Sequence, residues 1–207
     1  YREFYDLKQT TVISNPVPRL ETRGIARGTA TKEFVYWGRF IVMKNLTTLI
    51  RAFARARLPD DFTLALIGDG PRKQELISLI KELGLQSRVR IEPGMPFSNA
   101  MERIKNCRAF ILPSWTDISP NQVYEALAIG LPAIVTKENY LSVRNQLPET
   151  IDPNSVDDIS SKLEMLADDA EYHAFAEAFK SIKFAHNWDD VAREHLKMFD
   201  EVVQKEV

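Results

Sequence analysis

The chain has 207 residues, which is long for one domain and short for two, and its 44% hydrophobic content is enough for a substantial core. A formal net charge of −2 gives no electrostatic basis for binding nucleic acid or an anionic membrane. The single cysteine, Cys107, excludes an intrachain disulfide framework and is typical of a reducing compartment such as the cytoplasm. Because Cys107 precedes an apolar run, we expect a buried, unreactive thiol.

The sequence begins with Tyr1 rather than Met, and its first residues read as a segment already under way. We therefore interpret residues 1–18 as a linker and residues 19–207 as one domain that belongs to a longer protein. Residues 19–32 are polar and weakly patterned, which predicts a loop. The sequence shows no signal peptide and no run of the roughly 20 apolar residues needed to cross a bilayer.

Strand and helix signals alternate between residues 33 and 136. The runs that predict strands are 33–38, 62–68, 89–92, 109–114 and 132–136. The segments that predict helices between them are 45–57, 71–84, 97–107 and a helix starting near 120. This alternation predicts an α/β fold with a doubly wound parallel sheet, Rossmann-like, whose ligands bind outside the carboxyl ends of the strands. Three consecutive helices are then expected, at 157–167, 171–184 and 188–204.

The stretch from residue 117 to residue 136, DISPNQVYEALAIGLPAIVT, carries the first candidate site. Ser119 is predicted to cap a helix, with Pro120 in its first turn and Gln122 as capping-box partner. The amino end of such a helix suits a phosphate. Glu125 lies about 7–8 Å further along the axis, which is the distance from a diphosphate to its ribose. Asp117 would face the group beyond the far phosphate. The alternative is a capped core helix with a solvated Glu125.

The second candidate is GRFIVMKN, residues 38–45, which follows the first strand. Arg39 and Lys44 bracket a short loop at the carboxyl end of that strand, where two cations can hold a diphosphate. The alternative is two solvated surface cations.

The third motif is GDGP, residues 68–71, after the second strand. Its glycines allow a tight turn, but Lys73 stands where a dinucleotide-binding fingerprint needs its third glycine. We therefore predict a turn with a packing role rather than a dinucleotide site.

In order and spacing, these motifs resemble the donor-binding half of the retaining, group 1 glycosyltransferases of the GT-B fold. That family carries G-R-[LF]-x-x-x-K, G-x-G-P, two acids eight residues apart, and E-A-x-x-x-G-x-P. The corresponding residues here are Gly38-Arg39-Phe40 with Lys44, Gly68 to Pro71, Asp117 with Glu125, and Glu125-Ala126 with Gly130-Leu131-Pro132. VISNPV, residues 12–17, is similar to the family's segment leading into this half. The resemblance spans roughly residues 12 to 136.

The resemblance implies a role for each matching residue. Arg39 and Lys44 would bind the donor diphosphate and stabilise the leaving group, and Gly38, directly before Arg39, would be a further donor-binding residue. Glu125 would bind the ribose, and Asp117 would contact hydroxyls of the donor sugar near the anomeric carbon. The backbone around this helix start would assist, at Ile118, Ser119, Pro120 and Asn121. The loop over residues 92–96 would lie near the base, which makes Gly94 and Met95 candidate donor-binding residues.

The resemblance also implies a reaction and its partners. The donor would be a nucleotide-diphosphate sugar of the UDP or GDP type, transferred with retention of configuration and without metal or cofactor. The sequence has no D-x-D motif, which agrees. The partner would be an N-terminal acceptor-binding domain of the same protein, against which Trp188 and the last helix would pack. Membrane contact would come only through that missing half, and the isolated chain would bind weakly and transfer no sugar. Two alternatives share the fold: a non-catalytic nucleotide-sugar-binding module and a sugar-nucleotide epimerase.

The sequence departs from the family pattern in two places. Asp117 stands where glutamate is usual, so the carboxylate is one methylene shorter and the sugar can differ. Residues 137–155 lack both the family's G-G-x-x-E loop and its G-x-L-V strand, so we expect this region to be trimmed or remodelled.

Overall fold

The computed structural model describes residues 13, 16, 28–184 and 186–204. The predicted linker at residues 1–18 lies outside the described residues except for Ile13 and Pro16. Most of the loop predicted at 19–32 also lies outside them.

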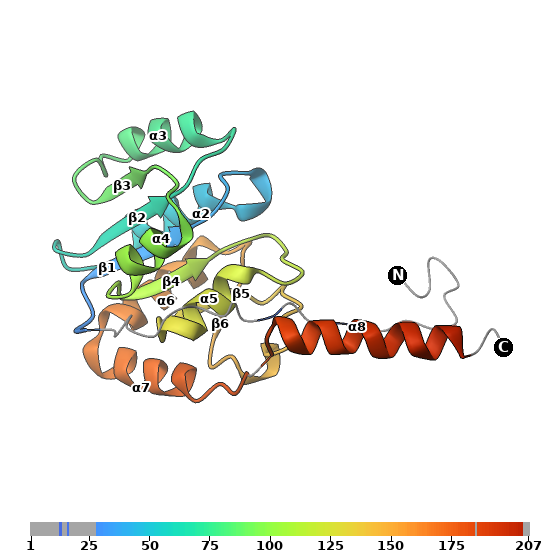
Figure 1. Cartoon of the computed structure of the whole chain (residues 1–207). Helices are drawn as coiled ribbons and strands as arrows, with labels where there is room; N and C mark the ends of the chain where they lie inside the picture. The colour runs from blue at the N-terminus through green and yellow to red at the C-terminus, as the bar shows by residue number, and fades with distance from the viewer. Residues whose placement is uncertain (1–12, 14–15, 17–27, 185, 205–207) are drawn as a thin grey trace.

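The described residues form one six-stranded parallel sheet (Figure 1). Its strands are β1 (Glu33–Trp37), β2 (Thr63–Ile67), β3 (Val89–Glu92), β4 (Ala109–Leu112), β5 (Ala133–Thr136) and β6 (Thr150–Ile151). They lie in the order β3-β2-β1-β4-β5-β6, and every pairing is parallel. The predicted doubly wound α/β sheet is therefore confirmed. Because the order reverses between β1 and β4, the switch point at which such sheets bind ligands lies between these two strands.

The helices between the strands cover both faces of the sheet. They are α2 (Leu46–Arg55), preceded by the short η1 (Val42–Lys44), then α3 (Lys73–Glu82), α4 (Phe97–Ile104) and α5 (Asn121–Ile129). With right-handed crossovers, α2 and α3 lie on one face, and α4 and α5 lie on the other (Figure 1). The carboxyl-terminal helices are α6 (Val156–Ala167), which packs beside α2, then α7 (Asp169–Lys180) and α8 (Trp188–Val203). The predicted helices thus exist, with ends that differ by a few residues.

The core follows directly from the sequence patterns. The run TLALI of β2 has no polar alternation because helices cover both of its faces, and its last four residues are buried. In α2 the apolar residues recur at helical spacing, and the same stripe is buried against the sheet. As expected, Cys107 is buried and lies outside any disulfide. Burial is the main reason that the pKa of its thiol is raised to about 12. The thiol therefore stays protonated near neutral pH.

The segment after β5 contains a strand that the sequence patterns did not predict. Thr150 and Ile151 form β6, which pairs parallel with Val135 and Thr136. This strand lies at the edge of the sheet, within the segment 137–155 that we expected to be trimmed or remodelled. Two residues are too few to show a strand periodicity.

Arg108 joins β4 to the turn between α6 and α7. Its side chain is 5% exposed and lies 3.8 Å from the centre of the Tyr172 ring. The guanidinium donates to the backbone oxygens of Leu166 at 2.7 Å, Ala167 at 3.3 Å and Asp168 at 3.2 Å. A cation at the carboxyl end of a helix satisfies carbonyls that lack partners inside the helix. Arg108 therefore acts as the carboxyl-terminal cap of α6.

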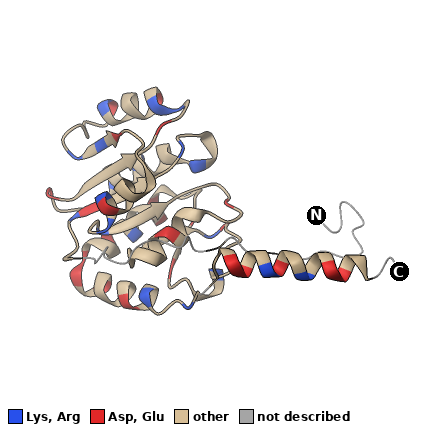
Figure 2. Cartoon of the chain, viewed as in Figure 1, with Lys and Arg blue, Asp and Glu red and all other residues tan. Residues whose placement is uncertain are grey.

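Helix α8 projects from the body of the domain (Figure 1) and contains no buried residue. Its amino end is well made, because Asn187 and Asp190 form a capping box. Trp188 is 63% exposed on this helix, together with Leu196, Phe199, Val202 and Val203. These apolar residues recur on one side, and the charged residues lie on the other (Figure 2). The helix thus presents an amphipathic surface to solvent.

Glu33, at the start of β1, is the centre of a buried ionic cluster. Its carboxylate accepts from Arg103 at 2.7 Å and also pairs with Arg90. Arg103 in turn donates to both carboxylate oxygens of Glu92, at 3.0 and 2.6 Å. Burial alone would raise the pKa of Glu33, but the hydrogen bond and charge of Arg103, together with the hydrogen bond from Cys107 and the charge of Arg90, outweigh burial, so the pKa is lowered. The cluster ties α4 to the sheet.

This cluster predicts a specific loss of stability in acid. A carboxyl group whose pKa is lower in the folded than in the unfolded state stabilises the fold above its ordinary value of 4.5. That contribution is lost as the pH falls through the lowered value. We expect Glu33→Gln to reduce the free energy of unfolding by about 2 kcal/mol at pH 7, and by progressively less as the pH falls through the lowered pKa and the wild-type carboxyl becomes protonated as well. Urea unfolding over a series of pH values from 7 downward measures this, with the exposed Glu82→Gln as control. A loss that stays the same at every pH would rule out the ionic explanation.

Candidate functional site

A cleft of about 720 Å³ opens at the carboxyl ends of the strands around the switch point. Its walls come from the segments that follow β1, β2, β3 and β4. Most of the residues predicted for the site line it: Gly38, Arg39, Lys44, Gly94, Met95, Asp117, Ser119, Pro120, Asn121 and Glu125. Ile118 does not line the cleft, and its side chain is 70% exposed. Residues separated by up to 87 positions are thus brought together, because parallel strands end at the same edge.

The segment after β1 places two cations in the cleft. Arg39 is exposed, and among the residues that the structure describes no carboxylate forms an ion pair with it. Lys44 ends η1 and is only 12% exposed, because its Nζ lies 2.5 Å from a carboxylate oxygen of Asp117. One cation is therefore open to a ligand, and the other is neutralised within the protein.

Asn45 fixes this segment against its neighbours. It has a left-handed backbone with φ of 52°, a conformation that asparagine adopts more readily than most residues. Its buried side chain donates to the carbonyls of Pro113 at 3.1 Å and Pro153 at 2.9 Å. Asn45 therefore joins the segments after β1, β4 and β6 immediately beside Lys44.

Asp117 is held on both its side chain and its backbone. The hydroxyl of Ser114 donates to the Asp117 carboxylate at 3.1 Å, in addition to the contact with Lys44. Its backbone N–H donates to Glu138 O at 2.9 Å, and its carbonyl accepts from Tyr140 N at 3.2 Å. The segment that departs from the family pattern, residues 137–155, thus supports the back of this loop.

Helix α5 starts differently from the prediction. It begins at Asn121, with Pro120 in an extended conformation at the N-cap position and no side-chain cap. The predicted cap by Ser119, with Gln122 as capping-box partner, is therefore wrong. Pro120 occupies the position before the first helical residue, one place later than a Ser119 cap requires, and Gln122 instead lines the cleft. The amino end of α5 still opens on the cleft, where its partial positive charge favours an anion.

Glu125 lies one helical turn into α5, on the cleft side. One of its carboxylate oxygens, Oε2, accepts from the indole Nε1 of Trp37 at 2.7 Å. Burial raises the pKa of Glu125, and the hydrogen bond from Trp37 partly opposes this shift. The prediction of a merely solvated carboxylate does not apply, because Glu125 is partly buried and has a specific partner.

The GDGP motif packs against the segment after β1, which confirms the predicted turn with a packing role, and its Gly68 and Asp69 also line the cleft. A Cβ on Gly68 would lie 2.0 Å from the carbonyl oxygen of Gly38, and a Cβ on Gly70 would lie 2.5 Å from that of Phe40. The two segments are joined by hydrogen bonds from Phe40 N to Asp69 O at 2.8 Å and from Gly38 N to Ile67 O at 3.0 Å. The glycines thus let the segment after β2 approach the cation-bearing segment after β1.

The far wall of the cleft, which follows β3, is mainly apolar. Gly94 and Met95 line it, together with Phe97, Ala100 and Met101 of α4. Phe97 is 44% exposed and adds an aromatic ring to this wall. The site therefore combines a polar, charged end beneath α5 with an apolar end beneath α4.

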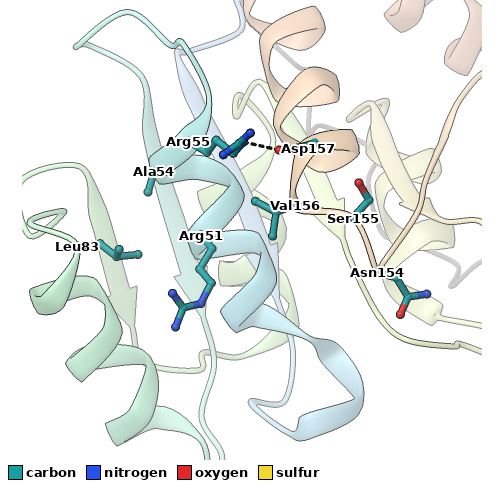
Figure 3. Close-up of a pocket in the computed structure, with 8 residues that line it drawn as sticks. All are labelled: Arg51, Ala54, Arg55, Leu83, Asn154, Ser155, Val156 and Asp157. Carbon is teal, nitrogen blue, oxygen red and sulfur yellow. Dashed lines mark ion pairs between the residues drawn. The ribbon is translucent and has the colours of Figure 1, made fainter.

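A second cavity, of about 760 Å³, lies away from the strand ends (Figure 3). Its lining residues come from α2, the end of α3 and the start of α6: Arg51, Ala54, Arg55, Leu83, Asn154, Ser155, Val156 and Asp157. Arg55 pairs with Asp157, but both side chains are more than 60% exposed. Ser155 is occupied as the N-cap of α6. This cavity is an open groove between helices, and none of the described residues that line it is a buried polar residue.

The described part of the chain has no helix long and apolar enough to span a bilayer. Within the same residues there is no cluster of three or more His, Cys, Asp or Glu side chains that could hold a metal ion.

Similarity to solved structures establishes the fold first. A mutant of Staphylococcus aureus TarM, in complex with fondaparinux, alpha-GlcNAc-glycerol and UDP, aligns with a TM-score of 0.78 at 15% identity, over 95% of this chain and 41% of TarM. The C-terminal domain of a group 1 family glycosyl transferase from Francisella tularensis aligns with a TM-score of 0.63 at 22% identity, over 74% of this chain and 85% of that one. The fold is that of one half of a GT-B glycosyltransferase.

The sequence then gives the family. Residues 21–182 match the family described as glycosyl transferases group 1, and the chain belongs to this family. An uncharacterized glycosyltransferase of Methanocaldococcus jannaschii is 32% identical over 134 residues. The match covers 64% of this chain but only 32% of that relative, so the chain corresponds to about a third of its length.

Proposed function

We propose that this chain is the donor-binding domain of a retaining, metal-independent glycosyltransferase that uses a nucleotide-diphosphate sugar. The observation that carries the proposal is the convergence of three groups on one cleft: the cations Arg39 and Lys44, the amino end of α5, and Glu125. Each suits a different part of one ligand, respectively the leaving-group oxygens, a phosphate, and the hydroxyls of a ribose. The UDP that is bound to TarM, a protein of the same fold, supports this choice of ligand.

The chemistry follows from the charges in the cleft. Breaking the bond between the sugar and the diphosphate leaves negative charge on the diphosphate, and two fixed cations stabilise that charge. Lys44 is paired with Asp117, so a phosphate that binds this lysine would compete with that carboxylate. Release of Asp117 from Lys44 would leave its carboxylate for hydroxyls of the donor sugar. In this proposal Arg39 and Lys44 supply the positive charge, and no metal or cofactor is required.

The acceptor site belongs, in this proposal, to an N-terminal domain of the same protein. The matched segment covers about a third of the M. jannaschii relative, and the F. tularensis structure is a C-terminal domain. The exposed apolar side of α8, which includes Trp188, supplies a surface for packing against that domain. Any membrane contact would come through the same domain. The buried free thiol of Cys107 suits a cytoplasmic protein.

Isothermal titration with UDP, GDP and inorganic pyrophosphate tests the proposal. Arg39→Ala removes a charged hydrogen-bond donor and is expected to lower the affinity for all three ligands about tenfold or more. Glu125→Gln removes the charge but keeps the shape of the side chain. It should lower the affinity for UDP and GDP and leave the affinity for pyrophosphate, which has no ribose, unchanged. The control is Arg51→Ala, an exposed arginine outside the cleft.

Unchanged affinities in both variants, with folding intact, would contradict the proposal. The isolated chain should bind nucleotide weakly and transfer no sugar, because half of the cleft is supplied from elsewhere. Turnover of UDP- or GDP-sugars by the purified 207-residue chain would contradict this last point.

A further inference from the structure

Trp37 is the last residue of β1, and its indole forms part of the cleft wall. The side chain is almost fully buried, and its ring centre lies 4.0 Å from that of Phe110 on the neighbouring strand β4. The ring therefore has little freedom to change its position. Its Nε1 donates to Glu125 Oε2 at 2.7 Å across the cleft floor.

This contact has chemical consequences for Glu125. An indole N–H is a donor only, so it can bind Glu125 only through a carboxylate oxygen that accepts. The hydrogen bond fixes one oxygen of the carboxylate and sets the plane of the group. It also favours the ionised form of a carboxyl group that burial pushes toward the neutral form. The other charged groups that line the cleft are those of Arg39, Lys44, Asp69 and Asp117. In the part of the chain that the structure describes, none of them forms a hydrogen bond or ion pair with Glu125.

We propose that Trp37 is a positioning residue for ribose recognition: its indole N–H holds Oε2 of Glu125 so that Oε1 accepts from a hydroxyl of the nucleoside. The inference rests on the proposed function, because it names how the same cleft selects a nucleoside diphosphate over a bare diphosphate. Because the hydrogen bond to Oε2 holds the carboxylate in place, Oε1 is a fixed acceptor. A fixed acceptor loses less conformational freedom when the ligand binds.

Trp37→Phe tests the inference, because phenylalanine keeps a six-membered aromatic ring to pack against Phe110 and removes the N–H donor together with part of the indole volume. UDP affinity, measured by isothermal titration, is expected to fall about tenfold, equivalent to about 1.4 kcal/mol, and pyrophosphate affinity to stay unchanged. In a Glu125→Ala background, Trp37→Phe should cause no further loss of UDP affinity. Trp115→Phe, a matched change at an exposed tryptophan that does not line the cleft, should leave both ligands unaffected.

The outcomes separate this inference from the function on which it rests. If the wild-type chain bound neither UDP nor GDP, both would be overturned. Suppose that the wild type binds UDP and that Glu125→Ala lowers the UDP affinity, but that Trp37→Phe leaves the UDP affinity unchanged. Only the role of Trp37 would then be overturned. An equal loss of UDP and pyrophosphate in Trp37→Phe would also overturn it, because a general distortion of the cleft affects both ligands.

Discussion

Gly68→Ala is expected to reduce the free energy of unfolding by at least about 3 kcal/mol. The new Cβ would lie 2.0 Å from the carbonyl oxygen of Gly38, a contact with backbone that no side-chain rotation can relieve. The residue also has a φ of +147°, which an alanine rarely adopts. Because Gly38 leads directly into the segment that carries Arg39, the backbone shift needed to relieve the contact should also reduce UDP affinity.

The matched control is Gly84→Ala. Gly84 also has a positive φ, of 68°, but a Cβ there meets nothing within 4 Å. Its cost should be about 1–2 kcal/mol, from the backbone conformation alone. Urea unfolding of both variants separates steric contact from backbone strain. Equal losses would mean that the segments after β1 and β2 are not packed together as closely as described.

Arg108→Ala is expected to cost about 3 kcal/mol or more of the free energy of unfolding. The guanidinium donates to three backbone oxygens at the end of α6, and hydrogen bonds from a charged donor contribute about 1.5–3 kcal/mol each. Truncation also exposes the face of Tyr172 on which the guanidinium lies. The pair with Asp169 adds little, because that carboxylate is exposed to solvent.

Arg108→Lys distinguishes charge from geometry. Lysine keeps the charge but cannot direct several donors at diverging carbonyls, so it should recover only a small part of the lost stability. Arg55→Ala is the control, since Arg55 is an exposed arginine with an exposed partner. Thermal and urea unfolding measure all three variants. A loss in Arg108→Ala no greater than that in Arg55→Ala would show that Arg108 does not cap α6.

Much of the fold could be predicted because its signals are local. The buried run of β2 predicts a strand and the apolar stripe of α2 predicts a helix, each from a few consecutive residues. The alternation of strands and helices then predicts a parallel sheet. The sequence did not predict the strand β6, because two residues are too few to show the alternation of buried and exposed side chains that marks a strand. Its place is set by pairing with β5, which is a long-range effect.

The candidate site divides in the same way. Arg39, Lys44 and Asp117 could be found from their positions after predicted strands, since the ends of parallel strands meet. The contact of Trp37 with Glu125 could not be predicted, because the two residues are 88 positions apart and nothing in the sequence around Trp37 marks it as a partner of Glu125. The cap by Ser119 was wrong because the local sequence allows more than one helix start, and in the folded chain the helix begins after an extended Pro120.

The central place of β1 has a consequence for the growing chain. β1 is the first strand of the sheet to be synthesised, yet it lies between β2 and β4. One edge of β1 therefore keeps unpaired backbone groups until residues 109–112 have left the ribosome. Such an edge on an apolar strand can pair with another unfinished chain. The walls of the cleft are complete only once α5 has followed, so a nascent chain remains vulnerable to aggregation until most of the domain has been made.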